Sequence, residues 1–278
     1  MTWQPSPDWQ PLTTGTGQAT GGVWRTPDGQ VVKRLVPGVT DPRHHGFWER
    51  QALVAESGIV AGTAGLRAPA CLGVERDADG ITLRMADVPP AEWHPEGLAA
   101  ALGRFAGCSV AEPAWGARDV LRDRLRTVER RGGWAPLTRA GLASAAVEEL
   151  WARRASALAV LDGLPRVPTH GDAHPVNLLG RSGDDVVAID WEQFGLGPAG
   201  FDLGYLLLAT DLPLDDLLAA YDGRTADVGA VRCGATLVAA YTGVSRAAWA
   251  IERPGAEDHL ERLARLSAVV DEAVSHAS

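Results

Sequence analysis

Cysteine is scarce in this sequence, and long apolar runs are missing. The three cysteines, Cys71, Cys108 and Cys233, are widely spaced and odd in number, which excludes a disulfide framework and a zinc-binding spacing. No stretch approaches the roughly 18 apolar residues that cross a bilayer, and the first residues lack the basic segment and apolar core of a signal peptide. We therefore predict a soluble, cytoplasmic protein that does not bind membranes.

Positive charge is also in short supply. The chain carries 26 Lys and Arg against 35 Asp and Glu, a net charge of -9, which argues against nucleic acid as a principal partner. Only one of the 26 basic residues is a lysine, Lys33, at the end of an apolar run. Chance could place it there, but a slim ammonium stem also suits a tight phosphate pocket better than the wide fork of arginine.

One stretch in the second half of the chain gathers polar groups that indicate chemistry. Two aliphatic runs, Val176–Leu179 and Val186–Ile189, are separated by a loop with two glycines, a pattern typical of an antiparallel hairpin. Asp172 precedes the hairpin, Asn177 follows five residues later, and Asp190 comes just after the second run. The hairpin therefore predicts that these three side chains converge.

The two runs also predict a register. If Leu179 faces Val186, then Asn177 lies across from Ala188, and Asp190 lies just beyond the paired end. Phosphoryl transfer needs ligands for metal ions, a carboxylate that accepts the proton of a hydroxyl, and fixed positive charge on the nucleotide. The convergent side chains supply the first two.

Two other interpretations explain part of this stretch. Gly-Asp is common in turns, so the segment could be a surface turn followed by an acidic hairpin loop. His170, Asp172 and His174 could instead be alternate ligands of a hydrolytic zinc site. Neither interpretation accounts for Asn177 and Asp190, so we favour a nucleotide and metal site.

At these residues the sequence resembles the aminoglycoside phosphotransferase and choline kinase-like family. The family signature has the form His-Gly-Asp, four residues, Asn, and then a strand ending in Asp, and here it reads His170-Gly171-Asp172, Asn177 and Asp190. The resemblance implies that Asp172 is the catalytic base, that Asn177 and Asp190 hold Mg²⁺, and that His170 braces the loop. It also implies that Asp202 supports this loop from the start of a helix.

The resemblance implies roles near the N-terminus as well. Two strands around the turn at 27–29 would form a hairpin that ends with Lys33, and the resemblance places Lys33 on the nucleotide phosphates. Gly15 and Gly17 lie in a stretch of small residues that could bring backbone N–H groups to phosphates. A flexible loop is the other interpretation of that stretch.

The helix after this hairpin should carry a glutamate that pairs with Lys33. We predict this helix over 46–58, ended by a glycine. Relatives often carry the glutamate where Gln51 stands, so the sequence departs from the pattern here. Glu49 is the favoured partner of Lys33, with Gln51 next and Glu56 on the same face as Glu49.

Two strands over 68–74 and 79–85 follow, and the prolines at 89 and 90 then end regular structure. We interpret this point as the junction of an N-terminal nucleotide-binding lobe, 1–86, and a C-terminal lobe, 87–278, with the catalytic loop and the site for the phosphate acceptor. The resemblance places the adenine edge here, near Met85 and Asp87. Met85 could equally be a core residue.

From residue 94 onward the pattern is helical, with apolar residues at intervals of three and four. The predicted helices are 96–110, 118–131, 138–162, 201–210, 212–221, 227–249 and 257–277. The arginines of 118–131 alternate with acids, which predicts a solvated helix face and not a site for an anionic ligand. His44 and His45, in a loop bounded by prolines, are expected at the surface.

Together these features predict an α+β, two-lobe, protein-kinase-like fold with a small antiparallel sheet and a mainly helical second lobe. The predicted reaction is Mg²⁺-dependent transfer of phosphate from ATP or GTP to a hydroxyl of a small molecule, by a monomer or homodimer. An antibiotic, as in resistance or self-resistance kinases, is the favoured phosphate acceptor. The alternatives are a metabolic alcohol such as choline, ethanolamine or homoserine, and a pseudokinase that binds nucleotide without transferring phosphate.

Overall fold

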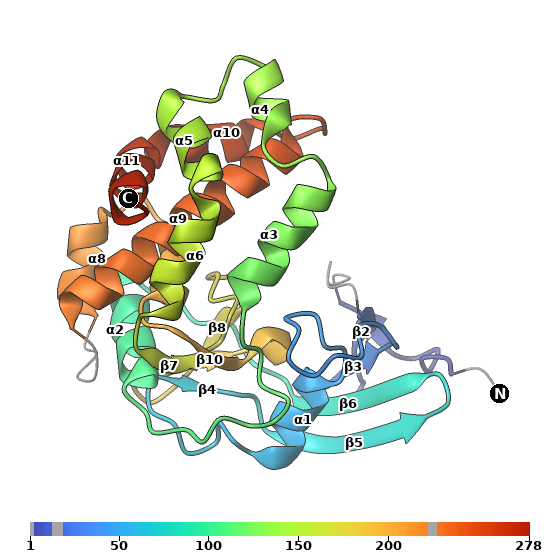
Figure 1. The fold of residues 1–278 in the computed structure, drawn as a ribbon. Helices are drawn as coiled ribbons and strands as arrows, with labels where there is room; N and C mark the ends of the chain where they lie inside the picture. Colours follow the sequence, from blue (N-terminus) through green and yellow to red (C-terminus); the bar gives the residue numbers. More distant parts are fainter. Residues whose placement is uncertain (1–2, 13–18, 222–226) are drawn as a thin grey trace.

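The computed structural model describes residues 3–12, 19–221 and 227–278. The fold is α+β, as predicted: an antiparallel sheet is built from the N-terminal part and helices make up most of the C-terminal part. Figure 1 shows the blue and cyan strands of the sheet at one end of the molecule and the helices of the second half at the other. The hairpin predicted to hold the site lies between them.

The N-terminal sheet contains both predicted hairpins. Its strand order is β1-β2-β3-β6-β5, with bounds β1 (Gln10–Pro11), β2 (Thr20–Arg25), β3 (Gln30–Leu35), β5 (Cys71–Asp77) and β6 (Gly80–Ala86). The first turn closes with Gly29 at φ 78°, a conformation that glycine adopts without steric cost. Lys33 on β3 lies between Val23 of β2 and Leu83 of β6 and is therefore central in the sheet.

Helix α1 (Arg50–Ser57) follows β3 and ends at Gly58, in the left-handed conformation, as predicted. The predicted start at Gly46 is wrong, because the residues just before the helix pair with an earlier segment of the chain. Phe47 forms an isolated bridge with Val39, and the Trp48 N–H donates to the Val39 carbonyl at 3.2 Å.

A second sheet lies between the lobes and contains the hairpin. Its order is β4-β9-β8, with β4 (Leu66–Arg67) parallel to β9 (Asp185–Ala188) and β8 (Leu178–Ser182) antiparallel to it. Two further strands, β7 (Arg166–Thr169) and β10 (Gly195–Pro198), pair with each other antiparallel. In the sequence they lie before and after the hairpin. The sequence pattern did not predict β4, β7 or β10, because each is only two to four residues long.

The helical part surrounds the long helix α9 (Val228–Ala250), which is buried along most of its length. The other helices are α2 (Pro95–Ala106), α3 (Val120–Arg130), α4 (Ala135–Arg139), α5 (Ala145–Ala152), α6 (Arg154–Asp162), α7 (Phe201–Leu207), α8 (Leu214–Ala220), α10 (Glu257–Arg265) and α11 (Ser267–His276). Within the described ranges, no helix is both long and apolar enough to span a bilayer.

Two predicted helices are each broken into two. The segment 138–162 contains α5 and α6, which meet at Arg153, and 257–277 contains α10 and α11, which meet at Leu266. Leu266 is 4% exposed. It packs so closely on Gly243 of α9 that a Cβ at Gly243 would lie 2.5 Å from the Leu266 side chain. The break between α10 and α11 therefore places Leu266 in the core, against α9. The apolar pattern runs on through this point and does not reveal the break.

Arg50 joins the two lobes from the first turn of α1. It is fully buried, and its guanidinium donates to five backbone carbonyls: Trp115, His45, Glu192, Pro42 and His44, at 2.6–2.9 Å. A guanidinium has five N–H donors, so all of them are used. Burial lowers the pKa of Arg50 to about 10.

The expectation that His44 and His45 lie at the surface is wrong. Both are partly buried, and the His45 backbone N–H donates to the Asp123 carboxylate on α3 at 3.0 Å. The His45 ring nitrogen Nδ1 is 3.6 Å from the same carboxylate. Burial lowers the pKa of His45, and the Asp123 carboxylate partly opposes this effect.

This lowered pKa predicts a dependence of stability on pH. Because folded His45 binds a proton less readily than unfolded His45, its contribution is fully present above the unfolded pKa of about 6.5 and is lost as the pH falls through the folded pKa. We expect the unfolding free energy measured by urea titration to decline less steeply below about pH 6.5 in His45→Gln than in the wild type. The exposed His94, changed to Gln, is the control; equal slopes for His45→Gln and the wild type would contradict the prediction.

Candidate active site

The loop His170-Gly171-Asp172 follows strand β7 directly. Its shape depends on the backbone conformation of Gly171 and on hydrogen bonds to Asp202. Gly171 has φ 84°, and a Cβ there would lie 2.5 Å from the Gln193 carbonyl oxygen, so both conformation and space call for glycine. Asp202, in the first turn of α7, accepts the N–H of His170 at 2.7 Å and of Gly171 at 3.0 Å. Burial raises the pKa of Asp202, while His170 and the two N–H donors oppose the rise.

The His170 ring is also a support of this loop. It is fully buried, its Nδ1 accepts the Asp172 N–H at 3.3 Å, and its Nε2 lies 2.9 Å from the Ile189 carbonyl oxygen. Because Nδ1 accepts, Nε2 carries the proton and donates to Ile189. The ring thus connects the Asp172 loop to the end of β9, which leads into Asp190.

Asn177 lies against Asp172, as the hairpin predicted. Its Nδ2 donates to the Asp172 backbone carbonyl at 3.0 Å and to the Asp172 carboxylate at 3.2 Å, and the Asn177 backbone carbonyl accepts the Ile189 N–H at 2.8 Å. Asp190 is the next residue after Ile189. Asp172, Asn177 and Asp190 therefore come together at one end of the hairpin.

The predicted register of this hairpin is wrong, although the convergence is present. Leu178, not Asn177, pairs with Ala188, and Gly180 pairs with Val187, with an irregularity between them. β8 also continues to Ser182, so that the connection to Asp185 is two residues long and not six. The irregularity leaves Leu179 unpaired in the ladder, which is the property of a β-bulge.

Asp190 is in the left-handed region at φ 65°, the single non-glycine residue with positive φ among the described residues. Such a conformation is uncommon and, when the surroundings impose it, often marks a functional position. One carboxylate oxygen, Oδ1, contacts the Lys33 ammonium at 2.6 Å. The sequence-distant Lys33 thus reaches the same place as the hairpin residues.

The helix partner of Lys33 is Gln51, and the favoured expectation of Glu49 is corrected. Lys33 is 6% exposed, and its Nζ donates to Gln51 Oε1 at 2.7 Å. Glu49 is the N-cap residue, outside the helix proper, whereas Glu56 pairs with Arg76 at 2.5 Å on the exposed side. Since α1 begins at Arg50, its phase turns Gln51 toward β3.

The remaining predicted nucleotide residues have varied positions. Met85 is buried at 8% exposure on β6, and the Asp87 carboxylate forms an ion pair with Arg25 at 2.9 Å. Gly15 and Gly17 lie outside the described residues. A role of Met85 and Asp87 in adenine binding stays a prediction.

Glu192 was not singled out from the sequence. It lies in the short 3₁₀ helix η1 (Trp191–Gln193) directly after Asp190. Burial, with a smaller contribution from the Asp190 carboxylate, raises the pKa of Glu192 to about 7. The sequence signal that could have pointed to Glu192 is its place two residues after Asp190, the last aspartate of the family signature.

Arg124 of α3 and Arg246 of α9 were also missed. Their Nη2 atoms lie 3.7 and 4.0 Å from Asp172 Oδ1, and each guanidinium lies over the ring of Tyr205, at 4.9 and 5.4 Å from its centroid. The prediction that the 118–131 arginines form only a solvated face is therefore wrong for Arg124, whose side chain is 22% exposed.

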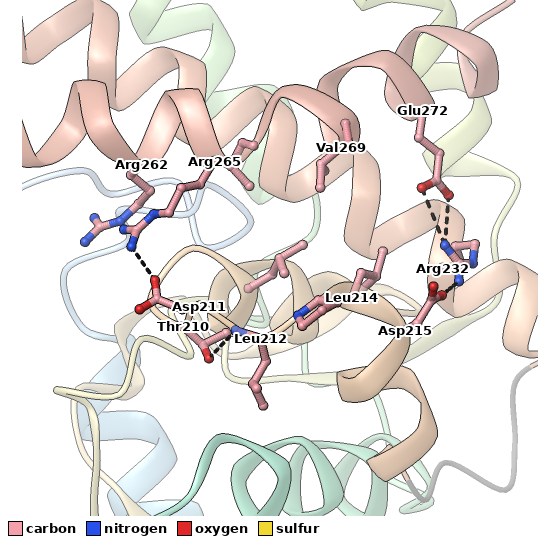
Figure 2. Close-up of a pocket in the computed structure, with 14 residues that line it drawn as sticks. Thr210, Asp211, Leu212, Leu214, Asp215, Arg232, Arg262, Arg265, Val269 and Glu272 are labelled. Atoms are coloured by element: carbon pink, nitrogen blue, oxygen red, sulfur yellow. Dashed lines mark hydrogen bonds and ion pairs between the residues drawn. The ribbon is translucent and has the colours of Figure 1, made fainter.

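A pocket among the described residues lies elsewhere, between α8, α9, α10 and α11 (Figure 2). Most of its charged side chains are paired with each other: Arg265 with Asp211, and Arg232 with both Asp215 and Glu272. This pairing leaves little charge for a ligand, and the pocket contains none of the predicted site residues.

The fold and the site geometry together define a kinase-like phosphotransferase. The sequence profile described as the phosphotransferase enzyme family matches residues 17–232, which is most of the chain. The chain belongs to this family. Among curated proteins, no sequence matches it.

Solved structures resemble this fold over nearly its whole length. A choline/ethanolamine kinase family protein from Mesorhizobium loti superposes with a TM-score of 0.64 and 19% identity, covering 96% of this chain and 90% of that one. The GDP complex of aminoglycoside 2'-phosphotransferase-IIIa superposes with a TM-score of 0.60 and 15% identity, covering 96% and 92%. At such identities the likeness shows the fold alone.

Proposed function

We propose that this protein transfers the γ-phosphate of ATP or GTP to a hydroxyl of a small molecule, with Mg²⁺. The observation that carries the proposal is the convergence of Asp172, Asn177, Asp190 and Lys33, from three separate segments, on one site. The fold supports it, because the family consists of phosphotransferases.

The polar atoms at the site fit a magnesium ion. Asn177 uses its Nδ2 on Asp172, and Asp190 uses Oδ1 on Lys33, so Asn177 Oδ1 and Asp190 Oδ2 have no hydrogen-bond donor among the described residues. Both are hard oxygen donors, the ligands that Mg²⁺ prefers together with phosphate oxygens. Bound there, the metal would neutralise charge on the transferred phosphate.

Residues of the chain carry out the remaining tasks of the reaction. Asp172 accepts the proton of the hydroxyl while the hydroxyl oxygen forms a bond to the γ-phosphorus, and the bond from that phosphorus to the β–γ bridging oxygen breaks. The products are a phosphate ester and a nucleoside diphosphate. Lys33 steadies the phosphates, and His170 and Asp202 hold the loop that positions Asp172.

One screen tests the proposal. The protein is incubated with Mg²⁺ and γ-labelled ATP or GTP against aminoglycosides, macrolides, nucleoside antibiotics, choline, homoserine, glycerate and glycerol 3-phosphate, and labelled product is sought. Labelled small molecule supports the proposal. Label on protein, or nucleotide binding without transfer to any compound or to water, would contradict it and favour a protein kinase or a pseudokinase.

Lys33→Arg is expected to lower kcat/KM for the nucleotide by about 10²-fold or more, since a buried ammonium between two acceptors leaves no room for a planar fork. The contacts to Gln51 Oε1 and Asp190 Oδ1 at 2.7 and 2.6 Å fix this space. Arg34→Lys, the reverse exchange on the next residue of β3, is the control in the same steady-state assay. Wild-type kinetics in Lys33→Arg would remove Lys33 from nucleotide binding.

An antibiotic as phosphate acceptor stays a prediction, and so does a metabolic alcohol. The fold does not choose between them, because one fold serves many substrates.

A further inference from the structure

Two arginines from different helices are held beside Asp172 in a fixed arrangement. Arg124 projects from α3 and Arg246 from α9, and both guanidiniums lie over the one ring of Tyr205, which is fully buried. Stacking on an aromatic face holds a guanidinium in place. Arg124 is held further by its hydrogen bond to Gln193 Oε1 at 2.6 Å.

Asp172 forms only long ion pairs with these two arginines. Its Oδ1 is 3.7 Å from Arg124 and 4.0 Å from Arg246, beyond the range of a hydrogen bond. Arg246 has no hydrogen-bond acceptor within the described ranges, although its side chain is only 30% exposed. Asp172 offers one negative charge to two like charges in a partly buried space, so a second anion would stabilise the pair.

Burial lowers the pKa of both arginines; Asp172 and Glu192 oppose this effect at Arg124, and Asp172 opposes it at Arg246. Arg262 of α10 has a buried Nε without a partner in the described part of the chain. Asp172 itself must face the hydroxyl, so it is not free to neutralise the arginines during the reaction.

We propose that Arg124 and Arg246 bind an oxyanion group, a carboxylate or a phosphate ester, on the molecule whose hydroxyl is phosphorylated. This inference rests on the proposed function and names the class of its phosphate acceptor. A guanidinium pair matches the two oxygens of such groups. Ammonium groups would be repelled here, so polycationic antibiotics do not fit.

The geometry also limits the size of the acceptor. Each hydrogen bond spans roughly 2.8 Å, and the arginine nitrogens lie 3.7–4.0 Å from Asp172 Oδ1. The reacting hydroxyl oxygen and the anionic oxygen are then at most about 10 Å apart. Hydroxy acids and phosphorylated alcohols of three to six carbons span such a distance.

The test uses two sets of compounds, each built on one carbon chain, whose members carry an anionic, a neutral or a cationic group. The three-carbon set is glycerate, glycerol 3-phosphate, glycerol and serinol; the six-carbon set is gluconate, sorbitol 6-phosphate, sorbitol and glucamine. Binding to the full chain is measured by calorimetry with Mg²⁺ and a non-hydrolysable nucleotide. We expect at least one anionic member to bind about tenfold or more tighter than its neutral partner, with the amines weakest. The carboxylate and phosphate members distinguish the two oxyanions.

Variants of Arg246 assign the effect to the arginines. Arg246→Gln should reduce the preference for the anion about tenfold, and Arg246→Lys, which keeps the charge, should retain most of it. Arg253→Gln, at an exposed arginine just past the end of α9, is the matched control and should bind like the wild type. If no anionic member binds, if the amines bind as tightly, or if Arg246→Gln keeps the full preference, the inference is overturned.

A phosphate-transfer assay on the same compounds separates the two proposals. An anionic compound that binds through Arg246 but receives no phosphate would contradict the proposed function and leave the anion site standing. Transfer to the amines, with Arg246→Gln as active as the wild type, would support the proposed function and overturn the anion site.

Discussion

Asp172→Asn is expected to lower turnover by about 10³–10⁴-fold, because the amide cannot accept the proton of the hydroxyl. Asparagine has the shape of aspartate, and the loop is held by His170 and Asp202 through backbone N–H groups. Nucleotide affinity should therefore stay close to the wild-type value. Steady-state phosphate transfer and nucleotide titration measure the two effects separately.

A matched control is Asp184→Asn, at an exposed position in the turn between β8 and β9. It should leave both turnover and affinity unchanged. If Asp172→Asn turned over at the wild-type rate, Asp172 would not be the base. If it lost nucleotide binding as well, the carboxylate would serve the nucleotide or metal and not the hydroxyl.

Arg50→Met is expected to lower the unfolding free energy by about 4 kcal/mol or more, among the largest effects of a single change. Methionine fills part of the space but removes the Arg50 donor from five backbone carbonyls, of which that of His44 still accepts the Phe47 N–H. Each buried carbonyl left unpaired costs about 1–3 kcal/mol, and partial access of water keeps the total below the sum. Urea unfolding of both proteins measures the difference.

The exposed ion pair of Arg76 with Glu56 provides the comparison. Arg76→Met should change the unfolding free energy by less than about 1 kcal/mol, because exposed pairs contribute little. Similar losses for Arg50→Met and Arg76→Met would show that the buried contacts of Arg50 do not stabilise the fold. If Arg50→Met lost activity at urea concentrations below its unfolding transition, we would infer that Arg50 also orders η1.

The site residues close in sequence could be predicted, because a hairpin brings them together whatever its register. The Asn177 backbone carbonyl accepts the N–H of Ile189, the residue before Asp190, despite the irregularity between Leu178 and Gly180. A one-residue slip normally turns side chains to the other face. Here the two functional residues lie beyond the paired segments, at the open end of the hairpin, and so tolerate the slip.

Residues whose role depends on packing between distant segments could not be predicted. The sequence offered both Glu49 and Gln51 as partners of Lys33, and the choice between them depends on where α1 begins, just after the bridge between Val39 and Phe47. Arg124 belongs to a helix with alternating charges, and only its packing near Arg246 and Tyr205 separates it from its solvated neighbours. One sequence shows the periodicity of such a helix but not which turn faces the site.

The contact between Lys33 and Asp190 has a consequence for the proposed reaction. A divalent cation arriving alone would have to compete with an ammonium already 2.6 Å from the Asp190 carboxylate. The phosphates of a nucleotide would offer Lys33 a substitute anion and so free Asp190 for the cation. We therefore expect bare Mg²⁺ to associate weakly and the metal–nucleotide complex to enter as one unit.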